Sequence, residues 1–449
     1  MKVLKYITLL LLSVFVFTAC SDDDGAGSAT MSISKVYLED AKSTVTDREV
    51  SFARLGQLLR IEGSGFTGLK KVYINGYDTY FNGALLTDNN IWVTLNIKTP
   101  ITNAVDSLRN TIVLVKDNSS LTYHFTIRAS SPSVTSVDNT LPMAGEKVTV
   151  YGSNLQETNK ITLPGGVEVT DNIINDAEGK WYSFIMPEGV TESGSITSEG
   201  ANGTAVTPAY FNNNNCYIIN FDGKGVQGSW SATYSADDLV DDPLNSGRGK
   251  VAQIVPDELK GGANAKGFWT SGNDEPTDDW TRMTEFIPAN TPVDSIALQF
   301  DVYVPQTWSL SGQMEITLQN NLANYGYGSG NTKYNADYIN QAYAWVPWLD
   351  RETGAVTPFT TGSRWQTVTI PLSEFGNYTN KDKTWTFKNV IDDKNGGSYR
   401  NFGFLFVNPD LKYSEDLTYT ATGISGLKIY VDNFRLVPIT AKSVSDFDD

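Results

Sequence analysis

The chain alternates apolar and polar residues over several short stretches, which is the pattern of half-buried β-strands. Residues 296–304 place Ile, Leu, Phe and Val at every second position, and residues 314–318 do the same with Met, Ile and Leu. Residues 365–372, 401–407 and 427–436 also have strand composition, and helical periodicity is nearly absent. We therefore expect an all-β protein in which residues 216–438 form a large, jelly-roll-like β-sandwich.

Two segments of the first half match each other at a constant shift of 89 positions, which takes Gly63 to Gly152 and Trp92 to Trp181. Each copy has short strands separated by Gly, Asn and Asp turns, the pattern of an immunoglobulin-like sandwich. The openings ISKVY and VTSVD, followed by Gly-Ser pairs, resemble IPT/TIG modules. We expect two such modules, at 31–128 and 131–212, in which Gly63 and Gly152 form turns with positive φ.

The N-terminus has the residue order of an export signal. Lys2 and Lys5 precede an apolar run at 7–17, too short to span a bilayer, and Cys20 follows Ala19. This order resembles a bacterial lipoprotein signal at 1–19, which implies lipidation of Cys20 and a flexible tether at 20–30. The acidic residues 22–24 resemble a cell-surface export signal. We expect a lipid-anchored, surface-exposed protein of the outer membrane.

The formal charge of −17 argues against nucleic acid as a partner and suits a neutral ligand better than an anionic one. Cys216 has no second cysteine to pair with once Cys20 is lipidated, and we expect it to be buried. His124 is the single histidine, so His-rich metal sites are excluded. No cofactor or metal is predicted, although Asp222 and Asp432, near the first and last strands of the sandwich, leave a structural calcium open.

Residues 324–349 concentrate five tyrosines and tryptophans 345 and 348 among Gly, Asn and Ser, without a steady period. Flat aromatic rings with nearby amides suit a sugar, whose ring is apolar on its faces and hydroxylated at its rim. The alternative is that these rings belong to the core, because all-β domains carry Tyr and Trp at half-buried positions.

Seven motifs of the C-terminal region resemble one family. They are INFDG at 219, LQFDVYVP at 298, WVPWL at 345, RWQTVTIPL at 364, WTFKNVI at 385, YRNFGFLFVN at 399 and IYVDNFRLVP at 429. They are similar to the glycan-binding domain of surface glycan-binding lipoproteins from Bacteroidota polysaccharide utilisation loci. The lipoprotein signal, the two IPT/TIG modules and this domain follow the family's order over nearly the whole chain.

The resemblance implies a platform of aromatic rings that stacks on a glucan, with amides that bond its hydroxyl groups. Because Trp345 and Trp348 are three residues apart, an extended chain would face them in opposite directions, one to the sugar and one to the core. For each candidate, ordinary packing or an exposed strand end is the alternative. The candidate glycan-binding residues are Trp308, Tyr343, Trp345, Trp348, Tyr325, Tyr327, Trp385 and Gln319.

The resemblance also implies a non-catalytic protein that binds a neutral polysaccharide, a β-glucan such as xyloglucan. Its implied partners are a TonB-dependent transporter and a companion glycan-binding lipoprotein. Two alternatives stay open. One is a polysaccharide hydrolase or lyase, which would need two carboxylates about 5–10 Å apart. The other is an adhesin that binds protein through its Ig-like modules.

Overall fold

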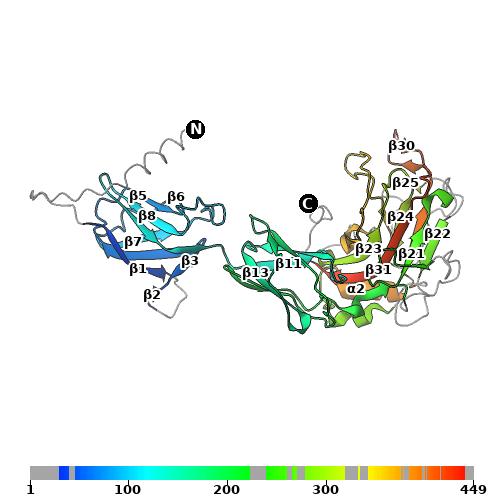
Figure 1. The fold of residues 1–449 in the computed structure, drawn as a ribbon, viewed down its shortest axis with the longest axis horizontal. Helices are drawn as coiled ribbons and strands as arrows, with labels where there is room; N and C mark the ends of the chain where they lie inside the picture. The colour runs from blue at the N-terminus through cyan, green and yellow to red at the C-terminus, as the bar shows by residue number, and fades with distance from the viewer. Residues whose placement is uncertain are drawn as a thin grey trace, which may run out of the picture. The chain divides into compact units, whose positions relative to one another are not determined.

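The computed structural model describes residues 30–39, 46–222, 239–259, 265–269, 279–318, 332–333, 342–375, 378, 384–396, 400, 402–414 and 416–439. These residues form strands arranged in several sheets, so the all-β prediction is confirmed (Figure 1). The chain divides into two compact units, Met1–Ala129 and Ser130–Asp449. No helix in the described part of the chain is both long and apolar enough to span a bilayer.

The first unit is an Ig-like sandwich. Two four-stranded sheets, in the orders β2-β1-β4-β7 and β6-β5-β8-β9, enclose a core that includes Leu59, Ile61, Val72 and Leu114. A short parallel pair, β3 with β10, lies beside them. The strands are β1 (Ser32–Glu39), β2 (Arg48–Glu49), β3 (Phe52–Arg54), β4 (Leu58–Ser64), β5 (Lys71–Ile74), β6 (Tyr77–Thr79), β7 (Asn90–Thr94), β8 (Thr111–Val115), β9 (Ser120–His124) and β10 (Thr126–Arg128).

The second Ig-like module opens the second unit. Its sheets have the orders β11-β12-β16-β15 and β14-β13-β17-β18, around a core that includes Val148, Val150, Ile161 and Phe184. The strands are β11 (Ser133–Val137), β12 (Lys147–Ser153), β13 (Thr158–Leu163), β14 (Val167–Val169), β15 (Ile174–Asn175), β16 (Trp181–Ile185), β17 (Thr197–Gly200) and β18 (Gly203–Val206).

The repeated glycines have a different role from the predicted one. Gly63 and Gly152 lie inside β4 and β12 and are not among the residues with positive φ, so the expectation of a turn is wrong. A Cβ on Gly63 would lie 1.9 Å from the carbonyl oxygen of Ser32, and a Cβ on Gly152 equally close to that of Ser133. Each glycine therefore permits the close approach of a neighbouring strand, at a shift in strand register in both copies.

The rest of the second unit is the larger sandwich. Its six-stranded sheet has the order β20-β21-β31-β23-β27, with β19 also beside β31, and its second sheet, the β24 sheet, has the order β22-β28-β24-β26. The first comprises β19 (Tyr217–Ile219), β20 (Leu239–Asp241), β21 (Lys250–Ile254), β23 (Ile296–Tyr303), β27 (Gln366–Pro371) and β31 (Ile429–Pro438). The second comprises β22 (Ala265–Trp269), β24 (Gln313–Thr317), β26 (Ala342–Trp345) and β28 (Gly403–Val407).

Phenylalanine rings join these two sheets. Phe434 of β31 stacks on Phe300 of β23 at a centroid distance of 5.0 Å, and on Phe404 of β28 at 5.2 Å. All three are completely buried, as the period-2 pattern predicts for inward positions. The large sandwich expected from the sequence is therefore confirmed, and Cys216 is buried at its start, as expected.

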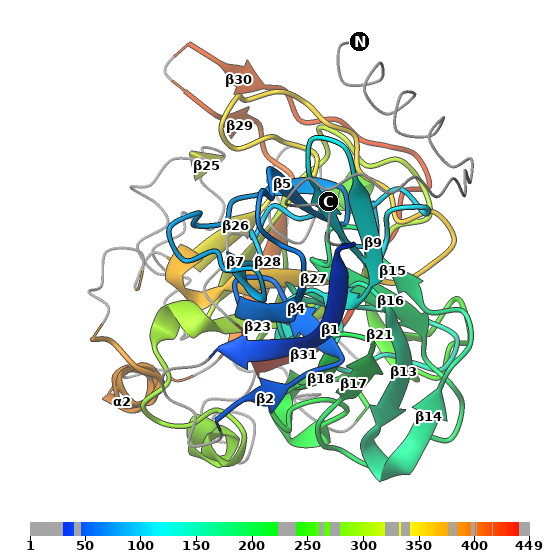
Figure 2. The ribbon, with the colours of Figure 1, turned by 90° about the vertical axis from the view of Figure 1, so that its left-hand side faces the viewer.

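Two smaller elements lie at opposite ends of the sandwich (Figures 1 and 2). One is the three-stranded sheet of β25 (Thr332–Lys333), β29 (Leu411–Lys412) and β30 (Thr418–Tyr419). The other is the helix α2 (Phe387–Gly396), which the sequence analysis did not anticipate. Phe387, Val390, Ile391 and Lys394 are buried on one side of this helix, which is a helical spacing.

A polar junction joins the second Ig-like module to the sandwich within the second unit. Arg435 of β31, which is fully buried, donates to Asn139 Oδ1 at 2.9 Å and to Thr140 Oγ1 at 3.3 Å. The Gln299 amide of β23 donates to the carbonyl oxygen of Asp138 at 2.9 Å. The outward face of the six-stranded sheet is buried here because it carries the module.

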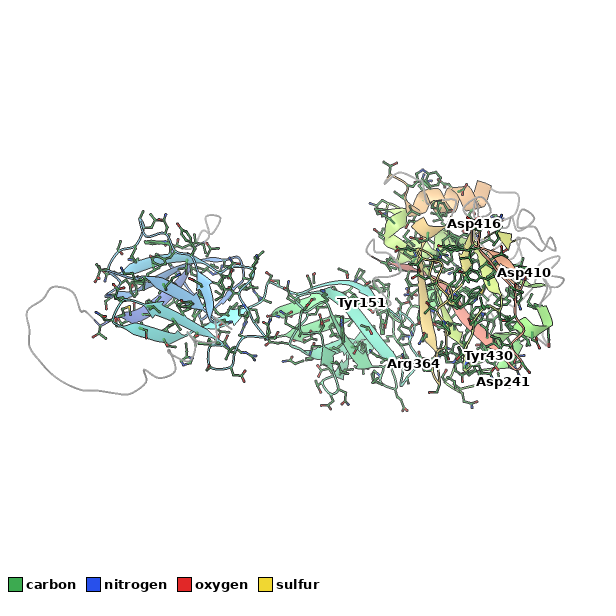
Figure 3. All side chains as sticks on the ribbon, turned by 90° about the horizontal axis from the view of Figure 1, so that it is seen from above. Tyr151, Asp241, Arg364, Asp410, Asp416 and Tyr430 are labelled. Atoms are coloured by element: carbon green, nitrogen blue, oxygen red, sulfur yellow. The ribbon has the colours of Figure 1, made fainter. Side chains whose placement is uncertain are left out.

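Three ion pairs lie at the junction. Arg248, whose side chain is 1% exposed, bonds Glu146 of the module at 2.7 Å and Asp301 of β23 at 3.4 Å. Arg435 bonds the other carboxylate oxygen of Asp301 at 3.2 Å. Figure 3 labels Tyr151 and Arg364 on the two sides of this junction. The division into 131–212 and 216–438 stays a prediction, since the two parts form one compact unit.

Candidate functional site

The aromatic stretch begins in the connection between two strands that pair with each other, and it continues through the second of them. Thr317, the last residue of β24, is the partner of Ala342, the first residue of β26. The chain from 318 to 341 therefore leaves and re-enters the β24 sheet at the same end, and between these points β25 pairs with β29. Tyr325, Tyr327 and Gln319 lie outside the described residues, so their binding role stays a prediction.

Other chain segments meet the same end of the β24 sheet. Gly403 begins β28 as the partner of Thr317, and Trp269 ends β22 as the partner of Gly403. The ammonium group of Lys394 on α2 donates to the carbonyl oxygen of Leu318 at 3.0 Å, and it lies 4.3 Å from the ring centroid of Trp280. Several connections of the sandwich therefore meet at this end of the β24 sheet.

The aromatic residues of β26 belong to the core. In the register of β24 and β26, Trp345 is opposite Met314 and Tyr343 is opposite Ile316. Because directly opposed residues share a face, both aromatic rings lie on the inward side of the sheet. They are 7% and 5% exposed, respectively. The described structure therefore contradicts an exposed platform at Trp345 and Tyr343.

Trp308 is also enclosed. It is completely buried, its ring lies 5.4 Å from that of Trp345 and 5.8 Å from that of Phe406, and its indole N–H donates to the carbonyl oxygen of Ser311 at 2.9 Å. The prediction that Trp308 stacks on sugar is wrong. The physical reason is that the loop after β23 pairs back at Phe359, which draws the indole inward.

Trp348 follows β26 and lies in a turn, with Leu349 N–H bonded to the carbonyl oxygen of Val346 at 3.1 Å. The expectation that Trp345 and Trp348 face in opposite directions assumed an extended chain, and the turn means that the chain is not extended here. Trp348 is 2% exposed, and its indole N–H donates to the carbonyl oxygen of Gly312 at 2.8 Å. Its predicted stacking role is therefore contradicted as well.

Trp385 is half-buried, just before α2, and its ring lies 6.1 Å from that of Tyr378. Its carbonyl oxygen accepts from the N–H of Val293 at 3.0 Å, which ties this part of the chain to the six-stranded sheet. Partial exposure is compatible with a place at the rim of a binding site, and that role stays a prediction.

The outward face of the β24 sheet carries a row of polar side chains that sequence reasoning did not select. Gln313, Glu315 and Thr317 alternate along β24 with the inward Met314 and Ile316, and each is at most 3% exposed. In the strand register their partners on β28 are Val407, Leu405 and Gly403, and Ala344 of β26 is opposite Glu315. The signal in the sequence that could have revealed this row is the alternation itself, in which an acidic residue stands between two polar ones on the same face of β24.

Burial raises the pKa of the Glu315 carboxyl to about 8, against a smaller opposing effect of the Gln313 amide. Gln313 Nε2 lies 3.0 Å from Glu315 Oε1, while Glu315 Oε2 and Gln313 Oε1 have no partner among the described residues. A neutral carboxyl beside an amide can both donate and accept, which suits a hydroxyl group. Gln313 also lines a cavity of about 10 Å³, which is large enough for a water but not for a sugar ring.

The fold defines an all-β protein in which two Ig-like modules are followed along the chain by a larger β-sandwich. The family of the surface glycan-binding protein B xyloglucan-binding domain matches residues 211–438, which is more than half of the chain. The chain belongs to this family, and the resemblance found in the sequence motifs is confirmed.

Individual relatives are more distant. An IPT/TIG domain-containing protein of Bacteroides ovatus is 27% identical over 192 residues, which make up 42% of this chain and 38% of that protein. The match thus covers well under half of that relative.

Two solved structures are similar to this chain. The crystal structure of the surface glycan-binding protein PbSGBP-B from Prevotella bryantii is 19% identical to this chain. The match covers 92% of this chain and 99% of that one, with a TM-score of 0.59, which is a likeness of fold. The SGBP-B from a complex xyloglucan utilization locus in Bacteroides uniformis is also 19% identical over 92% of this chain and 100% of that one, at a TM-score of 0.43.

Proposed function

We propose that this protein captures a neutral plant β-glucan, xyloglucan or a close relative, at the cell surface without cleaving it. The observation that carries the proposal is the match of the xyloglucan-binding family to residues 211–438, which include the whole β24 sheet and its aromatic connection. In this proposal the sugar lies along residues 319–341, with Tyr325, Tyr327 and Trp385 as stacking rings and Gln319 as a hydroxyl partner.

A binding role without catalysis is supported by the carboxylates of the sandwich. Within the bounds of its four strands, the β24 sheet carries one acid, Glu315. Glycoside hydrolysis ordinarily uses two carboxyl groups about 5–10 Å apart, on either side of the bond that is cleaved. Asp301 is bound by two arginines at the junction with the Ig-like module, on the other sheet.

The remaining parts of the chain fit delivery to an uptake system. Lipidation of Cys20 would hold the protein on the outer membrane, and the two Ig-like modules would hold the binding sandwich away from that surface. A TonB-dependent transporter and a companion glycan-binding lipoprotein would take over the captured polymer. The acidic charge of the chain favours neutral polymers over anionic ones.

Calorimetric titration of the full mature chain with xyloglucan and mixed-linkage β-glucan tests this proposal, with polygalacturonate as an anionic control. We expect binding of the neutral glucans in roughly the micromolar to millimolar range, which is typical of a shallow site. A reducing-sugar assay on the same mixtures should give no product. Absence of binding to every β-glucan would contradict the proposal, and release of new reducing ends would favour the hydrolase alternative.

A further inference from the structure

Asp432, in the middle of β31, has the most anomalous side chain of the sandwich. It is 0% exposed, and neither of its carboxylate oxygens has a hydrogen-bond partner. Among the described residues, no other acid has both oxygens in this state. A buried carboxylate without partners is strongly unfavourable, so a charge or a proton must balance it.

Asp432 lies where the neighbour of β31 changes. On the side of β31 away from β23, one part of the strand pairs with β19, with Ile219 opposite Phe434. Another part pairs with β21, with Ala252 opposite Val431. Asp432 falls between these two pairings. Asp432 therefore lies next to the end of β19 and the start of β21, where the strand that pairs with β31 changes from one to the other.

The nearby arginines are already engaged by other acids. Arg248 bonds Glu146 through both terminal nitrogens, at 2.7 Å and 3.0 Å, and Arg435 bonds Asp301 at 3.2 Å. Two guanidinium groups thus balance two carboxylates. Asp432, directly opposite Asp301 on the neighbouring strand, is left without a cation of its own.

A second carboxylate belongs to the same place, where β19 ends and β21 begins. Asp222, just after β19, accepts the backbone N–H of Lys250 at 2.8 Å, and its carboxylate lies over Gly249, where a Cβ would be 2.4 Å from Oδ2. The negative charge of Asp222 contributes to holding the pKa of Asp432 well above its ordinary value, after burial and the charge of Asp301. Asp222 is exposed, so the pair can be reached from solvent.

We propose that Asp432 and Asp222 bind a divalent cation, with Ca²⁺ as the best fit. Both donors are hard oxygen ligands, and their combined charge of two matches a divalent ion. Ca²⁺ tolerates irregular coordination completed by backbone oxygens and water. The described residues contain no group of three acidic, His or Cys side chains suited to a metal, so no third acidic side chain from that part of the chain joins the two carboxylates. The ion would tie the first strand of the sandwich to the last, beside the junction with the Ig-like module.

The test compares thermal melts of the full mature chain after treatment with EGTA, with and without added CaCl₂ or MgCl₂. A bound ion at about 100 times its Kd should raise the melting temperature of the second unit by about 5–10 °C. Asp432→Asn and Asp222→Asn should lose this response. Asp241→Asn should keep it, because Asp241 is an exposed neighbour paired with Lys250 at 2.7 Å. Elemental analysis of the untreated protein should find about one Ca²⁺ per chain more in wild type than in Asp222→Asn.

A melting temperature of the wild type that neither cation changes would overturn the proposal and assign a proton to Asp432. An unchanged Ca²⁺ response in Asp222→Asn would overturn it as well. That exposed variant keeps the test decisive if Asp432→Asn does not fold. The readout is independent of glycan binding, so failure of this site leaves the proposed function untouched.

Discussion

The rings of Trp308 and Trp345 pack edge to face, with centroids 5.4 Å apart and planes at 71°. Trp308 comes from the loop after β23 of the six-stranded sheet and Trp345 from β26 of the β24 sheet. The contact therefore joins the two sheets of the sandwich. Two residues expected to hold a sugar instead hold the domain together.

Trp308→Ala should destabilise the protein. Truncating a fully buried tryptophan typically lowers the free energy of unfolding by about 3–5 kcal/mol. Chemical denaturation followed by circular dichroism would measure the loss. Leu417→Ala, at a residue 38% exposed in the same unit, is the control and should change stability by less than about 0.5 kcal/mol. A Trp308→Ala protein of wild-type stability but lower glycan affinity would restore the platform role of Trp308.

Tyr325→Ala and Tyr327→Ala should each weaken binding to xyloglucan while the melting temperature stays constant. Stacking of a ring on a ligand is worth on the order of 1 kcal/mol or more, which is about fivefold in Kd. Titration calorimetry beside a thermal melt separates affinity from stability. Tyr80→Ala is a matched control, since Tyr80 is 81% exposed in the first Ig-like module. If Tyr325→Ala and Tyr327→Ala bound xyloglucan as tightly as the control Tyr80→Ala, the binding site would lie outside residues 319–341.

Glu146→Gln should destabilise the junction between the second module and the sandwich. The change leaves the buried Arg248 with one carboxylate partner, Asp301, and we expect a loss of about 1–3 kcal/mol. Glu168→Gln is the same substitution on the same module. Its partner Lys160 lies 2.7 Å away, and the two side chains are 56% and 35% exposed, so solvent screens the pair and the expected effect is under about 1 kcal/mol. Equal effects of the two substitutions in denaturant melts would mean that the junction adds no stability.

Stability should depend on pH through Glu315. The folded pKa of about 8 is raised above its ordinary value, so between about pH 4.5 and 8 the folded state holds a proton that the unfolded state has lost. The free energy of unfolding contributed by this group is therefore highest below pH 4.5 and falls as the pH rises to 8. The slope is at most about 1.4 kcal/mol per pH unit.

Glu315→Gln, which keeps the shape without a titrating group, should lack this slope. Denaturant melts of both proteins at pH 5, 6, 7 and 8 would give the difference directly. Parallel curves for wild type and variant would show that Glu315 titrates normally.

Cys20→Ala should release the protein from membranes without unfolding it, because the predicted attachment consists of acyl chains alone. Fractionation followed by immunoblotting gives the distribution. Cys216→Ala is the control, since Cys216 is buried in the sandwich and should leave the membrane fraction unchanged. Retention of Cys20→Ala in the membrane would contradict the lipid anchor.

The sequence supported the fold better than the site, for a physical reason visible in particular residues. Period-2 alternation places Phe300 and Val302 inward whatever surrounds them, so β23 was predictable. The same alternation does not show whether the outward face of β23 is exposed to water or covered by another part of the protein. Gln299 and Asp301 are buried there because the second Ig-like module covers them. That packing depends on segments distant in the chain, which local patterns do not encode.

The aromatic residues illustrate the same limit. A tryptophan in a loop has the same local sequence whether its indole stacks on a ligand or turns inward, and Trp308 and Trp348 turn inward onto backbone carbonyls. The helix α2 was missed for another reason. Its inward residues Phe387, Val390, Ile391 and Lys394 have helical spacing, but a lysine occupies the last apolar position and lies against Trp280.

The direct pairing of β24 with β26 has an evolutionary consequence. Since the two strands meet at Thr317 and Ala342 whatever lies between them, the intervening segment can gain, lose or exchange residues without disturbing the register of the sheet. Lengthening such a connection adds little loop-closure entropy. Descendants of this gene that bind a different glycan should accumulate insertions and deletions here first, while the sequence of the sandwich changes slowly.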